Sequence, residues 1–181
     1  MVFYDEKSIL NSLNKNAKVL LDTNILIRIE NSYTFNTDFL KVKNQFNFKP
    51  FVNPYIKYEF LKDRGQYLSN ISEIKKRYEF INSFEQLDVE VNSNFFKISN
   101  AIQKVCTSFK NPAIPSIDTF ILTHLYLDKD LYFLTQDKAD FSPKIFDVKS
   151  IFTIYDSDPL EEKRYYFHNN LLKLKHKVFE R

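Results

Sequence analysis

A short apolar run that ends on a carboxylate is the feature of this sequence that most restricts its fold. The run Val19–Leu21 leads directly into Asp22, which Thr23 and Asn24 follow before a helix-like segment begins. Apolar runs of this length ahead of a helix are typical of buried parallel strands. Because open α/β sheets bind ligands at the carboxyl ends of such strands, Asp22 is expected beside a functional crevice.

Three more acids occupy comparable positions along the chain. Glu59 lies in the helix-like stretch after Asn53, Asp118 lies at the start of another, and Asp137 follows a second apolar run, residues 131–134. Acids that stand at the boundaries of elements in one parallel sheet are expected to gather at one edge of it.

Short strands alternate with longer helices over most of the chain. Apolar residues at positions 117, 121 and 125 are spaced as on one face of a helix, and a strand-like run follows them. This alternation predicts an α/β fold with a central parallel sheet and helices on both faces. The strands are expected at 18–21, 51–52, 131–134 and 150–155, and the helices at 25–30, 39–46, 55–64, 71–84, 95–109, 117–127 and 160–179.

One domain, residues 17–156, accounts for the alternating pattern, and a shorter segment flanks it on each side. Residues 1–16 are predicted to form an N-terminal helical extension. Residues 157–181 are predicted to form a basic amphipathic helix that packs on the domain or extends from it. From position 159 to the end there are six basic and three acidic residues, which account for the whole formal net charge of +3.

The rarity of glycine and cysteine excludes several classes of site. Gly65 is the only glycine, so a Walker loop, a dinucleotide-binding fingerprint and a serine-hydrolase elbow are all excluded. Cys106 is the only cysteine, which excludes an internal disulfide and a cysteine-rich zinc site. No apolar run approaches the roughly 20 residues of a membrane span. A cytoplasmic protein without membrane contact is therefore expected.

Four carboxylates in one crevice would repel each other unless cations offset their charge. Mg²⁺ and Mn²⁺ are hard ions that prefer carboxylate oxygen and keep waters that exchange with phosphate. Such an ion lowers the pKa of a bound water and neutralises the charge that develops on a leaving oxygen. The acids therefore favour hydrolysis of a phosphodiester.

Each acid also has a purely structural interpretation. Asp22 can cap the following helix, which is worth about 1 kcal/mol. Asp118 can complement a helix macrodipole, an effect of about 0.3–1 kcal/mol. Glu59 alone would be an ordinary surface acid. His124 falls inside the helix of Asp118, and a role at the surface or in packing is expected for it rather than metal binding.

Taken together, these residues resemble the motifs of PIN domains. The resemblance covers roughly residues 17–156 and rests on the segments 21–24 and 134–141 together with Glu59 and Asp118. It implies a Rossmann-like fold and an endoribonuclease that depends on one or two Mg²⁺ or Mn²⁺ ions. The catalytic and metal-ligating residues that it implies are Asp22, Glu59, Asp118 and Asp137, and the supporting residues are Thr23, Asn24, Thr135 and Asp140.

Four lysines are candidates for holding the phosphates of an RNA substrate, because basic side chains neutralise phosphate charge. One of them follows the last acid, and the others belong to the basic segment near the end of the chain. They are Lys138, Lys173, Lys175 and Lys177.

The motifs are similar to those of VapC-type toxin ribonucleases, which implies an antitoxin or other inhibitor protein as a partner besides RNA. The chain is longer than such toxins before residue 17, between about residues 66 and 110, and after residue 158. The sequence is compatible with a homodimer and with a monomer. The alternatives are a non-catalytic PIN-like module that binds RNA or protein and, third, a structure-specific DNA flap nuclease. A phosphatase of the haloacid-dehalogenase type is excluded, because it needs an aspartate where this chain has Asn24.

Overall fold

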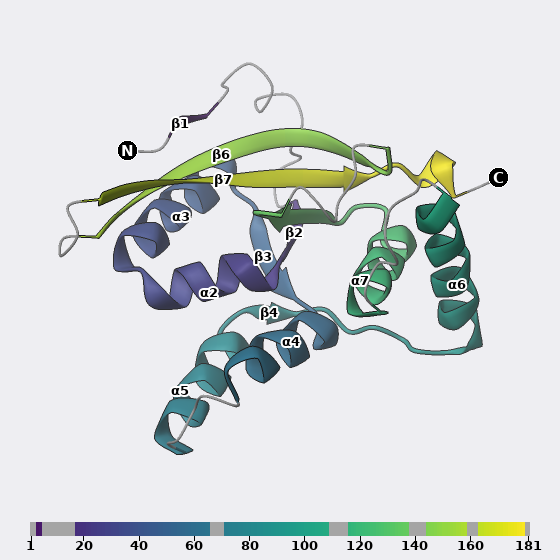
Figure 1. Cartoon of the computed structure of the whole chain (residues 1–181), viewed down its shortest axis with the longest axis horizontal. Helices are drawn as coiled ribbons and strands as arrows, with labels where there is room; N and C mark the ends of the chain where they lie inside the picture. Colours follow the sequence, from purple (N-terminus) through teal and green to yellow (C-terminus); the bar gives the residue numbers. More distant parts are fainter. Residues whose placement is uncertain are drawn as a thin grey trace.

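A computed structural model describes residues 3–4, 17–65, 71–108, 116–137, 144–158 and 163–179. Figure 1 labels the elements along the chain. The strands are β1 (Phe3–Tyr4), β2 (Lys18–Leu21), β3 (Lys49–Val52), β4 (Glu85–Gln86), β5 (Tyr132–Thr135), β6 (Phe146–Asp158) and β7 (Lys163–Leu174). The helices are α2 (Thr23–Asn31), α3 (Tyr33–Phe46), α4 (Pro54–Gly65), α5 (Ile71–Asn82), α6 (Ser93–Ser108), α7 (Ser116–Leu127) and the 3₁₀ turn η1 (His176–Val178).

The described strands form one sheet in the order β1-β6-β7-β5-β2-β3-β4. Its β5-β2-β3-β4 half is parallel, whereas β7, β6 and β1 are added antiparallel. In Figure 1, α2 and α3 lie on the left of the central strands and α6 and α7 on their right. The predicted α/β fold with a central sheet flanked by helices is confirmed. The expectation of a wholly parallel sheet is correct for one half only.

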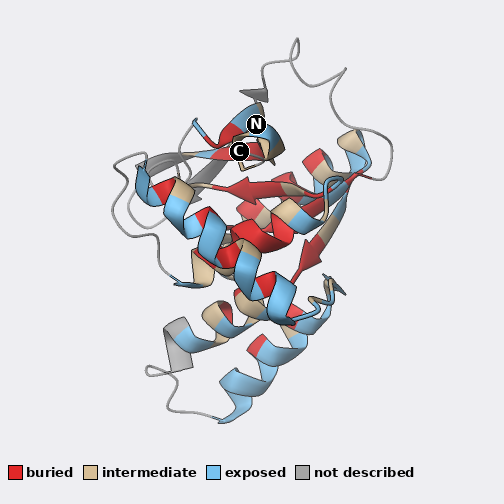
Figure 2. Cartoon of the chain, turned by 90° about the vertical axis from the view of Figure 1, so that its right-hand side faces the viewer, coloured by how far each residue is buried: buried red, intermediate tan, exposed pale blue. Residues whose placement is uncertain are grey.

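Strand β2 is the centre of the core, as its sequence predicts. Val19, Leu20 and Leu21 are all fully buried, which requires cover on both faces of the sheet. Figure 2 shows these central strands as buried and the outer faces of the helices as exposed. The strand runs parallel to β3 and to β5, so its carboxyl end lies beside theirs.

Helix α5 is attached to the rest of the molecule through a buried arginine. Arg77 is 5% exposed and forms a bidentate ion pair with Glu30 of α2, with nitrogen–oxygen distances of 2.8 Å. Its guanidinium also lies 4.2 Å from the centre of the Phe60 ring and donates to the Phe60 carbonyl of α4. One side chain therefore joins three helices.

The predicted C-terminal helix over residues 157–181 is wrong. Residues 163–174 form β7, which pairs antiparallel with β6 along its length and with β5 near Thr135. Strand β7 lies inside the sheet, and side chains on both of its faces are buried from Asn169 to Leu172. Burial on both faces removes the alternation that marks a strand, so its apolar residues can be mistaken for the stripe of an amphipathic helix.

The predicted N-terminal helical extension, residues 1–16, is described only at Phe3 and Tyr4. These two residues form β1, whose partners in β6 are Thr153 and Phe152, so this part is a strand and not a helix. The remainder of the extension lies outside the described residues. Among the helices that the structure describes, none combines the length and apolar character needed to cross a membrane.

Candidate functional site

Asp22 lies where β2 ends and α2 begins. Its backbone N–H donates to the Leu134 carbonyl of β5 at 2.9 Å, which places it beside the end of that strand. Its Oδ1 accepts from the Thr23 N–H at 2.7 Å, so Asp22 also caps α2. Its Oδ2 accepts from Asn24 Nδ2 at 2.8 Å and from the Thr135 hydroxyl. The structural and the functional interpretation of Asp22 are therefore compatible.

The loop after β5 is fastened to the start of α2 by a short chain of hydrogen bonds. Asn24 Oδ1 accepts from the Gln136 N–H at 3.2 Å, and Asn24 Nδ2 lies 3.2 Å from the Thr135 hydroxyl oxygen. That oxygen in turn accepts from the Asp137 N–H at 2.9 Å. These bonds fix the backbone of Asp137 relative to Asp22.

Glu59 and Asp118 reach the same region from two helices. The Thr23 hydroxyl donates to Glu59 Oε2 at 2.5 Å, which joins α4 to the start of α2. Asp118 lies in the first turn of α7. Both carboxylates are close enough to raise the pKa of Asp22 electrostatically. The structure thus brings these three acids to one end of the parallel strands, with Asp137 on the loop beside them.

The electrostatics of the site are dominated by Asp22, which is 8% exposed. The pKa of its carboxyl is raised to about 7, mainly by burial and also by the charges of Glu59 and Asp118, against the lowering effect of the hydrogen bonds from Thr135 and Thr23. A buried carboxylate with acidic neighbours is stabilised in its charged form by a nearby cation.

The donor set fits a hard divalent cation by its chemistry, since carboxylate oxygens are the ligands that Mg²⁺ and Mn²⁺ prefer. Across residues 17–65, 71–108, 116–137, 144–158 and 163–179, however, no three His, Cys, Asp or Glu side chains converge closely enough to hold an ion among them. Mg²⁺ is commonly bound through one or two carboxylates while it keeps several waters. The arrangement therefore fits an ion with few direct protein ligands better than a closed cage.

Three polar residues around this site, Gln136 and two asparagines of β7, were not predicted from the sequence. Gln136 Nε2 donates to Asn169 Oδ1 at 3.0 Å, and Asn170 Nδ2 donates to the Thr135 carbonyl at 3.4 Å. Both asparagines belong to β7, where Asn170 is the register partner of Thr135. Two adjacent asparagines inside an otherwise apolar segment are a signal that sequence reasoning could have used, because buried asparagines need hydrogen-bond partners.

The predicted substrate-binding lysines of β7 and beyond are not at this site. Lys173 Nζ lies 4.1 Å from the centre of the Tyr132 ring and donates to the Leu131 carbonyl, at the opposite end of β5 from Thr135. Lys175 pairs with an aspartate of β6 at 3.4 Å, and Lys177 follows in η1. Lys138 and Asp140 lie outside the described residues.

His124 has the packing role expected of it. It is 6% exposed, and its Nδ1 lies 3.2 Å from Nδ2 of Asn53, the residue before α4. Burial lowers the pKa of its imidazole, which favours the neutral ring.

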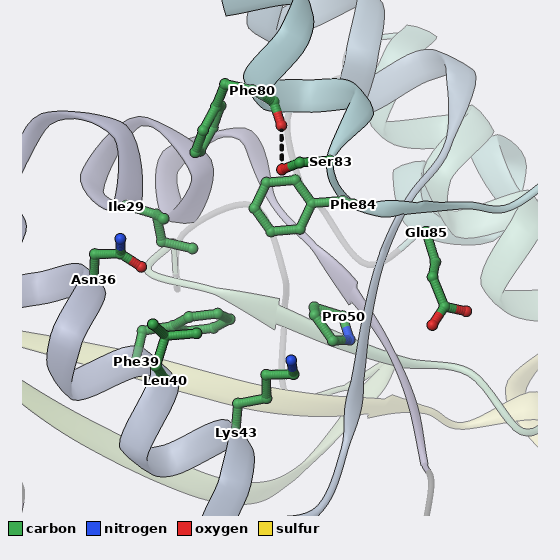
Figure 3. A pocket seen from close by; sticks show the side chains of 10 residues that line it. All are labelled: Ile29, Asn36, Phe39, Leu40, Lys43, Pro50, Phe80, Ser83, Phe84 and Glu85. Carbon is green, nitrogen blue, oxygen red and sulfur yellow. Dashed lines mark hydrogen bonds between the residues drawn. The ribbon is translucent and has the colours of Figure 1, made fainter.

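A separate pocket of about 430 Å³ lies between α3, β3 and the turn from α5 to β4 (Figure 3). Its wall is mainly apolar, with Phe39, Pro50 and Phe84 around it and Lys43 and Glu85 at its rim. None of the residues that line it belongs to the hydrogen-bond network of Asp22. The pocket is therefore distinct from the acidic site.

No protein-family model matches the chain, and no curated protein matches it. Among solved structures it is similar to the crystal structure of VapBC2 from Rickettsia felis bound to a DNA fragment from their promoter. The identity is 13% and the TM-score 0.47, over 60% of this chain and 80% of that chain. A likeness at this level gives no evidence for a shared activity.

Proposed function

We propose that the chain is a PIN-type endoribonuclease that hydrolyses RNA with the help of Mg²⁺ or Mn²⁺. We further propose that it acts as a toxin whose activity an antitoxin inhibits. The observation that carries the proposal is the buried carboxylate of Asp22, whose pKa is raised to about 7 at the ends of parallel strands. The charged form of such a group is costly in a fold unless a cation offsets it, which favours a cation as its ligand.

Asp22, Glu59, Asp118 and Asp137 are the residues that would hold the ion, one or two of them directly and the others through waters that the ion keeps. When bound, it supplies a water of lowered pKa and neutralises charge on the phosphate. The Thr135 hydroxyl and the Asn24 amide hold one oxygen of Asp22, and the Thr23 hydroxyl holds one oxygen of Glu59. Two carboxylates are thus oriented before any ligand arrives, which reduces the entropy lost on binding.

The reaction is an in-line displacement at phosphorus. The oxygen of water forms a bond to phosphorus and gives up one proton to solvent, while the bond from phosphorus to a ribose oxygen breaks and that ribose oxygen takes up a proton from solvent. Charge accumulates on the phosphate oxygens in the transition state, which is the charge that a cation at the acidic site offsets.

The first test is cleavage of single-stranded RNA with Mn²⁺ by the wild type and by Asp22→Asn. We expect the substitution to lower the rate by about 100-fold or more, because a bound divalent ion supplies several kcal/mol of charge stabilisation. Asp130→Asn, which changes an exposed acid before β5, is the matched control and should leave the rate unchanged.

Equal activity of wild type and Asp22→Asn, or no cleavage with any divalent ion, would contradict the proposal. RNA binding that persists in EDTA without cleavage would instead identify a non-catalytic binding module. A DNA flap substrate in the same assay separates the ribonuclease from a flap nuclease.

A further inference from the structure

Four aromatic rings from three helices form a cluster that the proposed chemistry does not use. The Tyr55 ring of α4 is stacked 5.9 Å from the Phe95 ring of α6 and lies 5.1 Å from the Phe120 ring of α7. Phe96 of α6 completes the set, 5.9 Å from Phe95 and 6.2 Å from Phe120. We refer to these four rings as the aromatic cluster.

The aromatic cluster lies one helical turn from Glu59. Tyr55 precedes Glu59 by four residues in α4, and residues four apart lie one above the other on the same face of a helix. The face of α4 that carries the proposed ligand therefore also carries an aromatic ring.

Helix α7 brings Asp118 to the same end. Asn53, just before α4, contacts His124, whereas Tyr55, farther along α4, contacts Phe120, which is one turn earlier in α7. The two helices therefore run in opposite directions where they meet. Residues farther along α4 therefore lie nearer the start of α7, which carries Asp118. The aromatic cluster therefore adjoins the acidic site along α4, where Tyr55 and Glu59 share a face, and lies within one turn of Asp118 along α7.

The aromatic cluster has a buried floor and an open surface. Phe95 is 1% exposed, whereas Phe96 is 49% exposed, and Tyr55 and Phe120 are half-buried. The side of the molecule that carries α6 and α7 faces the viewer in Figure 2, and the outer face of α6 is exposed there. A large ring that is half open to water gains little from packing, which leaves a surface free for a flat apolar ligand.

Exposed lysines lie on two of the helices that carry these rings. Lys97 follows Phe96 on α6, and Lys62 lies three residues beyond Glu59 on α4, with both side chains exposed. Aromatic rings with lysines beside them match single-stranded nucleic acid, because bases stack on the rings while the lysines neutralise phosphates. A double helix presents its bases stacked inside and offers no such face.

We infer that the aromatic cluster is a stacking platform for an unpaired base of the RNA substrate, next to the phosphodiester that is cut. This inference rests on the proposed ribonuclease function. Phe96 supplies the open ring, Phe95 and Phe120 pack against it, and Tyr55 extends the cluster from Phe95 and Phe120 toward Glu59. The enzyme therefore prefers single-stranded RNA and tolerates different bases at that position, since every base has a face that can stack.

The test is RNA binding measured by fluorescence anisotropy, with Asp22→Asn as the background so that cleavage does not interfere. Phe96→Leu keeps an apolar side chain but removes the ring, and we expect it to weaken the binding of short single-stranded RNA by about 5- to 150-fold. Phe96→Trp keeps a ring and should bind at least as tightly as the parent. Tyr33→Leu removes a ring that is 87% exposed on α3 and should have no effect.

A set of RNAs that each lack one base locates the stacked nucleotide. One of them should bind the parent more weakly than intact RNA, and this penalty should disappear in Phe96→Leu. Equal binding by the leucine and tryptophan variants, or a penalty that persists without the ring, would overturn the platform. Cleavage by the wild type and by Asp22→Asn is measured in a separate assay. Failure of the ribonuclease proposal and failure of the platform therefore give different results.

Discussion

At the scale of single residues, Gln136 is held between two distant parts of the chain. Its backbone N–H donates to Asn24 at the start of α2, and its side chain donates to Asn169 of β7. Asn169 is itself fixed, because its Nδ2 donates to the carbonyls of Phe152 and Phe167 at 2.9 Å each. Gln136 is thus one residue through which β7 positions the loop that carries Asp137, beside the bond from Asn170 to the Thr135 carbonyl.

Gln136→Leu should therefore impair the site more than the fold. Loss of one hydrogen bond costs about 1 kcal/mol of stability, whereas loss of a group that orients a metal ligand typically lowers metal affinity or activity by about 10- to 100-fold. Calorimetric titration with Mn²⁺ and steady-state cleavage measure the two effects. We expect weaker Mn²⁺ binding and a lower kcat, with KM for RNA little changed.

Gln86→Leu is the matched control for that experiment. Gln86 Nε2 donates to the carbonyls of Ile81 and Phe84 near β4, away from the acidic site. It should lose similar stability but no Mn²⁺ affinity. Equal losses of Mn²⁺ affinity in both variants would show that Gln136 has no special role in positioning Asp137.

The sequence is informative about the residues of the site that come from contiguous motifs. Asp22, Thr23 and Asn24 are adjacent in sequence, and a strand followed by a helix is enough to predict that they lie at a strand end. Asn169 was not predictable in the same way, because its contact with Gln136 depends on the register between β5 and β7. Register follows from a pattern of one buried and one open face, and this pattern is missing in β7, where both faces are buried from Asn169 to Leu172.

At the scale of elements, Arg77 should be a large contributor to the position of α5 and α4. The Arg77 side chain is 6% exposed and that of its partner Glu30 is 19% exposed. Removing one member of a buried ion pair leaves the other without compensation, so Arg77→Met should destabilise the fold by about 3 kcal/mol. Urea unfolding measures this loss.

Two further variants separate the ion pair from simple burial. Lys75→Met removes an exposed pair with Glu79, 3.8 Å apart on the same helix, and should change stability by no more than about 0.5 kcal/mol. The double change of Arg77 and Glu30 to Met should cost less than the two single changes together. If the double variant lost the full sum, the two side chains would be energetically independent.

Elements were predictable where their own sequence carries both pattern and boundary. Strand β2 was predicted at its observed limits, and α7 was predicted within one residue of its start, Ser116. Strand β7 was not predicted. Side chains on both of its faces are buried from Asn169 to Leu172, so the sequence there lacks the period-two pattern of a strand. Periodicity alone does not separate a strand that is buried on both faces from a buried helix.

At the scale of the whole molecule, Asp22 links the stability of the fold to pH. Its pKa in the folded protein is raised to about 7, mainly by burial, from an ordinary value of 3.8. A raised pKa means that the folded state holds its proton more tightly than the unfolded state. The stabilising effect is complete below about pH 4 and is lost as the pH rises through about 7. Above that pH, the charged carboxylate opposes folding unless a cation is bound.

Asp22→Asn should therefore stabilise the metal-free protein at about pH 8 by up to roughly 4 kcal/mol, since a tenfold change in proton affinity corresponds to about 1.4 kcal/mol. Near pH 4 the two proteins should be nearly equal in stability. Urea unfolding in EDTA measures the difference across this range, and other titrating groups cancel because both proteins contain them. Saturating Mg²⁺ should then raise the free energy of unfolding of the wild type at about pH 8 and leave that of the variant unchanged. An ion stabilises the folded state only where it binds that state. A stability difference that stayed constant with pH would show that Asp22 does not titrate in this range. Mg²⁺ stabilisation of equal size in both proteins would show that Asp22 does not bind the ion.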